Sequence, residues 1–168
     1  MKLAARVLLF FLLTVKTFSA ELTWDAYGHY RFDKVFDISE ERKFYTLKNK
    51  SVVLTNTGIN GKSECGGHMS LLNGADTGTY FICKMEDSNG DFNYSEFNTT
   101  RGDSGTGVHS FTIISGTGRW EELVGQKCSG AYSQITGFDN NMEASYFWKG
   151  KCDIPDKTFD RFVNFKKE

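Results

Sequence analysis

The sequence predicts an all-β protein: an antiparallel barrel of about eight strands with two disulfide bonds. Its 17 glycines, 15% aromatic residues and frequent threonine, valine and serine are typical of strands joined by tight turns. After Asn49 the glycines recur too often for a long helix. Without helices to cover a sheet, a barrel or a sandwich remains. A closed barrel has no exposed edges, which suits a chain with a single proline.

The first 19 residues are predicted to be a secretory signal peptide that is removed. Lys2 and Arg6 form its basic region, residues 7–15 form its apolar region, and Thr17 and Ser19 place small residues before the cleavage point. The apolar region is shorter than the roughly 20 residues that cross a bilayer. No later segment is apolar enough to cross one. We therefore expect a secreted or periplasmic protein without a membrane span.

The rest of the chain has the length of one domain, which we place at residues 20–155, followed by a C-terminal tail at 156–168. Loss of Lys2, Arg6 and Lys16 leaves 17 of the 20 basic residues against 21 acidic residues, so the net charge is about −4. This balance, without a basic stripe, argues against a nucleic-acid partner. It predicts no particular oligomeric state.

Three segments precede the cysteines. Residues 21–33 are predicted to form the first strand, and the charged residues 37–43 either a loop or one helical turn capped by Ser39. Residues 44–57 form one strand, or two strands with a break at 48–50. On an unbroken strand, residues of even number share one face: Phe44, Thr46, Val52 and Leu54.

The first predicted hairpin turns around residues 73–76 and places Cys65 opposite Cys83. In this register Met69 opposes Thr79. One face of the hairpin is then apolar and is assigned to the core: Cys65, Met69, Leu71, Phe81 and Cys83.

The second predicted hairpin turns at the Asn-Gly pair of residues 89–90. This pair favours a type I′ turn, which needs positive φ at both central residues. The turn places Met85 opposite Tyr94 and Asp87 opposite Phe92. Met85 continues the apolar face of the first hairpin.

Residues 115–132 are predicted to contain a glycine turn and a buried aromatic plug between two strands, the first of which is formed by residues 108–114. A phosphate cradle is excluded because no helix follows and no P-loop lysine is present. The residues that define the turn and the plug are Gly116, Gly118, Trp120 and Gly125.

The last predicted hairpin turns at residues 137–143 and places Cys128 opposite Cys152 and Tyr132 opposite Trp148. The two cysteine hairpins predict the disulfides Cys65–Cys83 and Cys128–Cys152. Each bond closes a loop of about 20 residues, which is worth up to ~3 kcal/mol in the chain-entropy model. A zinc site would need close CxxC spacing, which is absent, and we expect no metal or other cofactor.

Three motifs together resemble those of the allene oxide cyclase barrel-like family, a calycin-like group that includes plant dirigent proteins. Residues 83–91, CKMEDSNGD, are similar to its C…D…GD hairpin; residues 116–125, GTGRWEELVG, to its GTG-(K/R)-aromatic turn; and residues 148–155, WKGKCDIP, to its closing W-x-G strand. The resemblance covers residues 52–155, with Glu122 in place of a family glycine. It implies a small eight-stranded antiparallel barrel. The family contains a cyclase, coupling-control proteins and small secreted proteins without assigned activity, so no catalytic residue can be transferred. The motif residues Gly116, Gly118, Trp120 and Gly125 are implied to be structural.

His109 is the candidate ligand-binding residue. It shares strand parity with Phe111 and Ile113, so it would point into a barrel lumen, where a histidine beside a carboxylate could transfer protons. The alternative is a surface or hydrogen-bonded core histidine. No serine-histidine-aspartate order, HExxH motif or cysteine-histidine pair is visible, and no catalytic residue is assigned.

Three further motifs of the sequence are of types found at binding or modification sites. Residues 87–91, DSNGD, resemble a calcium loop, but their glycine stands at the wrong position and a plain turn is favoured. Residues 101–103 are an RGD tripeptide in a predicted exposed loop, 99–107, as integrin recognition requires. Three sequons for N-glycosylation begin at Asn49, Asn93 and Asn98.

The sequence favours a non-catalytic binding or structural module whose partner is a small apolar ligand in the barrel mouth. A second hypothesis is an isomerase or cyclase of the allene oxide cyclase or dirigent kind that works by pocket shape. A third is a surface adhesion protein or antigen that uses the RGD loop. A cavity that holds His109 beside apolar walls would favour the second hypothesis, whereas a packed lumen would leave only a structural role.

Overall fold

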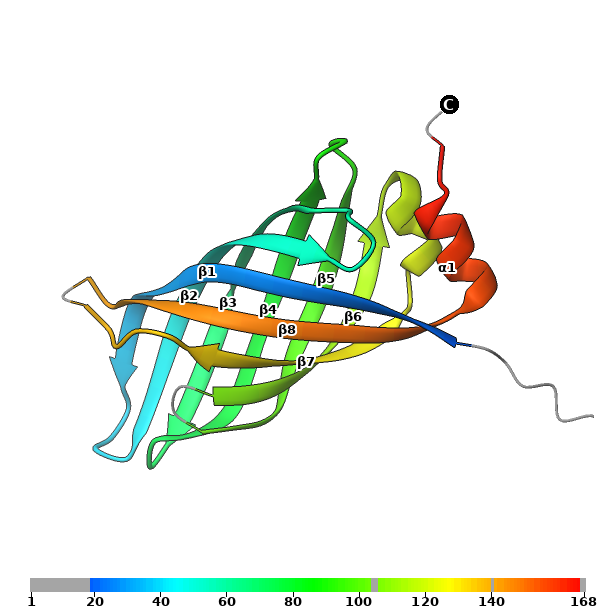
Figure 1. The fold of residues 1–168 in the computed structure, drawn as a ribbon. Coiled ribbons are helices and arrows are strands. Elements are labelled where there is room, and N and C mark those ends of the chain that lie inside the picture. Colours follow the sequence, from blue (N-terminus) through cyan, green and yellow to red (C-terminus); the bar gives the residue numbers. More distant parts are fainter. Residues whose placement is uncertain (1–18, 104–105, 140, 167–168) are drawn as a thin grey trace, which may run out of the picture.

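The computed structural model describes residues 19–103, 106–139 and 141–166, which form a closed barrel of eight antiparallel strands. Each strand pairs with the next one in the sequence, and β8 pairs with β1 to close the barrel (Figure 1). The predicted fold class is confirmed. Apart from Ser19, the predicted signal peptide lies outside the described residues. The elements are β1 (Ser19–Asp37), β2 (Arg42–Thr55), β3 (Gly61–Leu72), β4 (Ala75–Asp87), β5 (Phe92–Asp103), β6 (Thr106–Gly116), the 3₁₀-helix η1 (Gly118–Leu123), β7 (Lys127–Gln134), β8 (Glu143–Pro155) and the helix α1 (Asp156–Val163).

The two short helices close one end of the barrel (Figure 1). Trp120 of η1 and Phe162 of α1 are fully buried, and their ring centroids lie 5.0 Å apart. The sequence left a short helix or an edge strand open for the C-terminal tail, and its residues 156–163 form a helix. Glu122 of η1 accepts a hydrogen bond of 2.7 Å from Arg161 Nε, which links the two helices. No helix within the described parts of the chain is long and apolar enough to cross a membrane.

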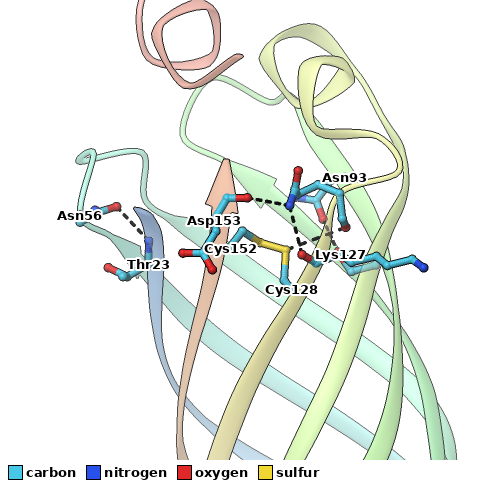
Figure 2. The surroundings of a disulfide bond; sticks show 9 residues. Thr23, Asn56, Asn93, Lys127, Cys128, Cys152 and Asp153 are labelled. Atoms are coloured by element: carbon cyan, nitrogen blue, oxygen red, sulfur yellow. Dashed lines mark hydrogen bonds between the residues drawn. A yellow bond between two sulfur atoms is a disulfide. The ribbon is translucent and has the colours of Figure 1, made fainter. Parts of the chain in front are cut away.

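Two disulfides join neighbouring strands. One links β3 to β4 and the other links β7 to β8, as predicted. Figure 2 shows the second bond, between Cys128 and Cys152, with Asp153 beside it. The side-chain amide of Gln126, directly before β7, donates a hydrogen bond of 3.0 Å to the Asp153 carbonyl of β8. The bonded pairs are Cys65–Cys83 and Cys128–Cys152.

The turn between β4 and β5 differs from the prediction. Gly90 has a φ of 79°, but Asn89 is not among the described residues with positive φ, so the predicted type I′ turn is wrong. The Asp87 carboxylate accepts hydrogen bonds from the backbone N–H groups of Asn89 (2.8 Å) and Asp91 (3.2 Å). These bonds favour a longer turn with a single glycine at positive φ.

The longer turn shifts the register by one residue. Met85 pairs with Asn93 instead of Tyr94, and Phe92 pairs with Glu86 instead of Asp87. A one-residue shift turns each side chain to the other face of the sheet. Asn93 is therefore buried inside the barrel, while Tyr94 is exposed.

A type I′ turn is present in the preceding hairpin. Asn73 and Gly74 both have positive φ, and the flanking Leu72 pairs with Ala75. The predicted registers of both cysteine hairpins are confirmed: Met69 pairs with Thr79, and Tyr132 with Trp148.

Three other segments refine the predictions. Residues 38–41 form a tight turn without a helix, in which Ser39 Oγ accepts a hydrogen bond of 3.1 Å from Arg42 N–H. β2 is one strand without the break at 48–50. Residues 101–103, the RGD tripeptide, are the last residues of β5 and pair with β6, so residues 99–103 and 106–107 form strands instead of the predicted loop, and residues 104–105 lie outside the described residues.

Candidate ligand-binding cavity

A cavity of about 120 Å³ lies inside the barrel and is lined by side chains from all eight strands. This volume is several times the roughly 10–15 Å³ that a cavity needs to hold one water molecule. The lumen is therefore not filled by its own side chains.

Phenylalanine rings on three neighbouring strands form one wall of the cavity. Phe81, Phe97 and Phe111 face each other in register across β4, β5 and β6. Their centroids lie 4.8 and 4.7 Å apart, and their planes differ by 12° and 11°. These separations match the spacing of paired strands, about 4.8 Å. The rings are therefore stacked along the sheet and present their edges to the lumen.

His109 lies inside the cavity, next to this wall. Its side chain is 5% exposed, stacks on Tyr132 at 5.1 Å and meets the Phe81 ring edge-on at 5.3 Å. Burial lowers the pKa of His109 to about 4, although the Asp76 carboxylate opposes the shift. The imidazole is therefore neutral at physiological pH, and its buried Nδ1 has no hydrogen-bond partner.

Two other buried polar atoms in the cavity lining also have no hydrogen-bond partner. They are Asn49 Oδ1 on β2 and Trp148 Nε1 on β8. The Trp148 indole covers Gly130 and Gly150, where an added Cβ would overlap the indole ring. The paired glycines on β7 and β8 therefore make the space that the indole occupies.

The remaining polar groups of the lining are uncharged hydroxyl and amide groups of serine, threonine, tyrosine and asparagine. Ser95 Oγ donates a hydrogen bond of 3.0 Å to Asn93 Oδ1. Ser63 Oγ lies 3.7 Å from Cys65 Sγ. None of the described side chains that line the cavity belongs to aspartate, glutamate, lysine or arginine. An ionic ligand would thus have no counter-charge in this wall.

The face of the strand on which each sequon asparagine lies decides whether its side chain is inside or outside the barrel. Asn49 lines the cavity and Asn93 is buried, so neither amide lies on the outer surface of the folded barrel. Asn98 is exposed. Surface exposure of Asn93, which the sequence allowed, is therefore wrong because of the register of β5.

The turn residues of the family-like motifs lie at the closed end, outside the cavity lining. The Trp120 indole donates a hydrogen bond of 3.1 Å to Asp87 Oδ2, whose side chain is fully buried. Gly118 and Gly125 have positive φ, and an added Cβ at Gly118 would overlap the Asp91 carboxylate. The GTG turn and the β4–β5 hairpin thus hold each other by a buried polar contact.

Gly116 completes this arrangement. An added Cβ at Gly116 would overlap Trp120, so the close packing of the plug requires a glycine there. Arg119 Nε lies 3.8 Å from Asp87 Oδ2 and forms a partly shielded ion pair.

Asn49 and Trp148 were not predicted to line a cavity. For Asn49 the sequence left a break at 48–50 open, and only an unbroken strand gives Asn49 the parity of Leu47 and Val53, which are buried. Among the described residues, no group of three or more histidine, cysteine or acidic side chains is suited to bind a metal.

Comparison of the sequence with models of protein families and with curated proteins gives no match.

Proposed function

We propose that this protein is a secreted or periplasmic binding protein that holds a small, mainly apolar ligand inside its barrel. The observation that carries the proposal is the uncharged cavity of about 120 Å³, with phenylalanine, tryptophan and methionine side chains in its wall. Apolar cavities with a few polar groups are typical of small-molecule sites. The resemblance to the allene oxide cyclase barrel-like family agrees with this proposal, because that family has the same type of barrel.

Two features support export. The two disulfides are typical of proteins that fold in an oxidising compartment. The N-terminal segment has the pattern of a signal peptide with cleavage after Ser19. Expressed with this segment in a secreting host, the protein should appear in the medium or periplasm with Ala20 as its first residue. Intact mass and N-terminal sequencing measure this, and an uncleaved N-terminus on exported protein would contradict it.

A binding test uses the neutral fluorescent probe N-phenyl-1-naphthylamine. We expect saturable binding at one site, with increased and blue-shifted emission, because the probe leaves water for the apolar cavity. Ala26→Phe inserts a ring into the lining and should weaken binding at least tenfold. Val52→Phe places the same ring on the exposed face of β2 and should leave binding unchanged. Non-saturable binding, or equal loss in both folded variants, would contradict the proposal.

An isomerase or cyclase is the second candidate function. The observation that favours it is His109, a neutral imidazole inside a largely apolar cavity. Such a cavity could fold a reactive substrate into one conformation. With the uncharged methyl ester of a fatty-acid allene oxide as substrate, chiral chromatography of the cyclised product should reveal an excess of one enantiomer, and His109→Phe should reduce that excess. A racemic product would contradict the isomerase or cyclase function.

A further inference from the structure

Three polar atoms in the cavity wall remain without partners, although buried polar groups are almost always hydrogen-bonded. Asn49 Oδ1 is an acceptor and Trp148 Nε1 is a donor. His109 Nδ1 can be either, according to its tautomer. An unsatisfied buried polar atom is costly, so these atoms mark places where a bound molecule would gain hydrogen bonds.

The three side chains are spread around the lumen. In a closed barrel of eight sequential strands, β2 and β6 are four strands apart in both directions, so Asn49 and His109 project from opposite walls. Trp148 on β8 stands midway between them on one side. A bound molecule would therefore meet polar groups at its periphery, from more than one direction.

The space between these groups is bordered by aromatic edges. The stacked Phe81, Phe97 and Phe111 present their ring edges to the lumen. Ring edges are electropositive and favour the face of another π-system in a T-shaped contact. Trp24 already makes such a contact with Phe111, at 5.7 Å and 74°.

We infer that the cavity selects uncharged, planar aromatic ligands that carry hydrogen-bonding groups at their edge, and that Asn49, His109 and Trp148 recognise those groups. The inference rests on the proposed function and names the ligand class for the same cavity. It assigns a recognition role to Asn49 and Trp148. Charged ligands are rejected because the wall offers no counter-ion.

The test uses a matched series of small ligands: naphthalene, 2-naphthol, naphthalene-2,6-diol and 2-naphthoate. Isothermal titration calorimetry at pH 7 measures their affinities for the full-length mature protein. Each hydroxyl should raise affinity over naphthalene by about 3- to 10-fold, the effect of one net hydrogen bond. The anionic 2-naphthoate should bind at least about tenfold more weakly than 2-naphthol, because its charge would be buried without a partner.

Three variants test which side chains recognise the hydroxyl groups of the ligand. Asn49→Leu, His109→Phe and Trp148→Phe each remove a polar atom and retain much of the side-chain volume. Each should lower the diol-to-naphthalene affinity ratio by about 3-fold or more. Phe97→Leu is the control, because it should weaken every ligand by a similar factor and leave the ratio unchanged.

The outcomes separate the inference from the proposed function. If neither naphthalene nor N-phenyl-1-naphthylamine binds the wild-type protein, the proposed function itself fails. If both bind, but hydroxyls bring no gain or naphthoate binds as well as naphthol, the inference alone is overturned. The comparison of ligands on the wild-type protein needs no variant, so a variant that fails to fold does not weaken the test.

Discussion

Two tryptophans with different surroundings show how much one buried polar contact contributes. Trp120 donates its indole N–H to the buried Asp87 carboxylate, whereas Nε1 of Trp148 has no partner. Trp120→Phe and Trp148→Phe remove the same atoms, but only the first leaves a buried carboxylate short of a donor. The first should cost about 1–3 kcal/mol more in the free energy of unfolding. Urea denaturation measures both losses, and equal losses would contradict a stabilising role for the Trp120–Asp87 bond.

His109 makes the stability of the protein depend on pH. Its pKa in the folded state is about 4, below the ordinary value of about 6.5, so the unfolded chain takes up a proton first as the pH falls. The stabilisation is complete above about pH 6.5 and is lost progressively down to about pH 4, by roughly 3 kcal/mol in total. Asp76 acts in the opposite direction and reduces the shift.

Urea unfolding at pH 7 and pH 4.5 measures this dependence. The free energy of unfolding of the wild type should fall by about 2–3 kcal/mol more than that of His109→Phe, which cannot titrate. Parallel losses in the two proteins would mean that another group causes the pH dependence.

At the residue scale, the sequence identified the cysteine pairs and the inward side of β6, but missed Asn49 and Asn93. Cysteine pairing and strand parity are local patterns that survive in the fold. Asn93 was misplaced because the Asp87 carboxylate binds two N–H groups of the turn, and this contact changes the length of the turn. A pattern of residue types does not reveal which side-chain contact decides between two turns.

Helix α1 is held to the barrel mainly by an apolar contact. Phe162 is fully buried against Trp120, whereas the Arg161–Glu122 ion pair is largely exposed. Phe162→Ala should cost about 3–5 kcal/mol, and Arg161→Ala less than about 1 kcal/mol. Thermal or urea unfolding measures both. A loss from Arg161→Ala as large as that from Phe162→Ala would show that the ion pair holds the helix.

At the element scale, two of the three Asn-Gly pairs of the chain stand between strands as predicted hairpin turns, and these two form different turns. Asn73-Gly74 adopts positive φ at both residues and joins its strands directly, whereas Asn89-Gly90 does so only at the glycine. The dipeptide alone therefore predicts a hairpin but not its register. Glu122 illustrates the same limit, because its contact with Arg161 depends on a helix whose existence the sequence left open.

For the whole molecule, the sequence predicted about eight strands in a closed barrel, because local residue patterns indicate each strand and each turn. The cavity was only a possibility at that stage. Its volume depends on how side chains from all eight strands meet at the centre, and strand pattern does not determine that packing.

The two disulfides stabilise the same barrel but occupy different places in it. Their bonded cysteines are 18 and 24 residues apart, so the chain-entropy model gives each about 3 kcal/mol. Only Cys65 and Cys83 line the cavity. The double variants Cys65→Ala/Cys83→Ala and Cys128→Ala/Cys152→Ala should therefore lose similar stability in urea denaturation. Their affinities for N-phenyl-1-naphthylamine should differ, with a change only in the first variant, because removal of its sulfur atoms alters the cavity wall. An equal change of affinity in the second variant would mean that ligand binding follows the rigidity of the whole barrel instead of the shape of its cavity.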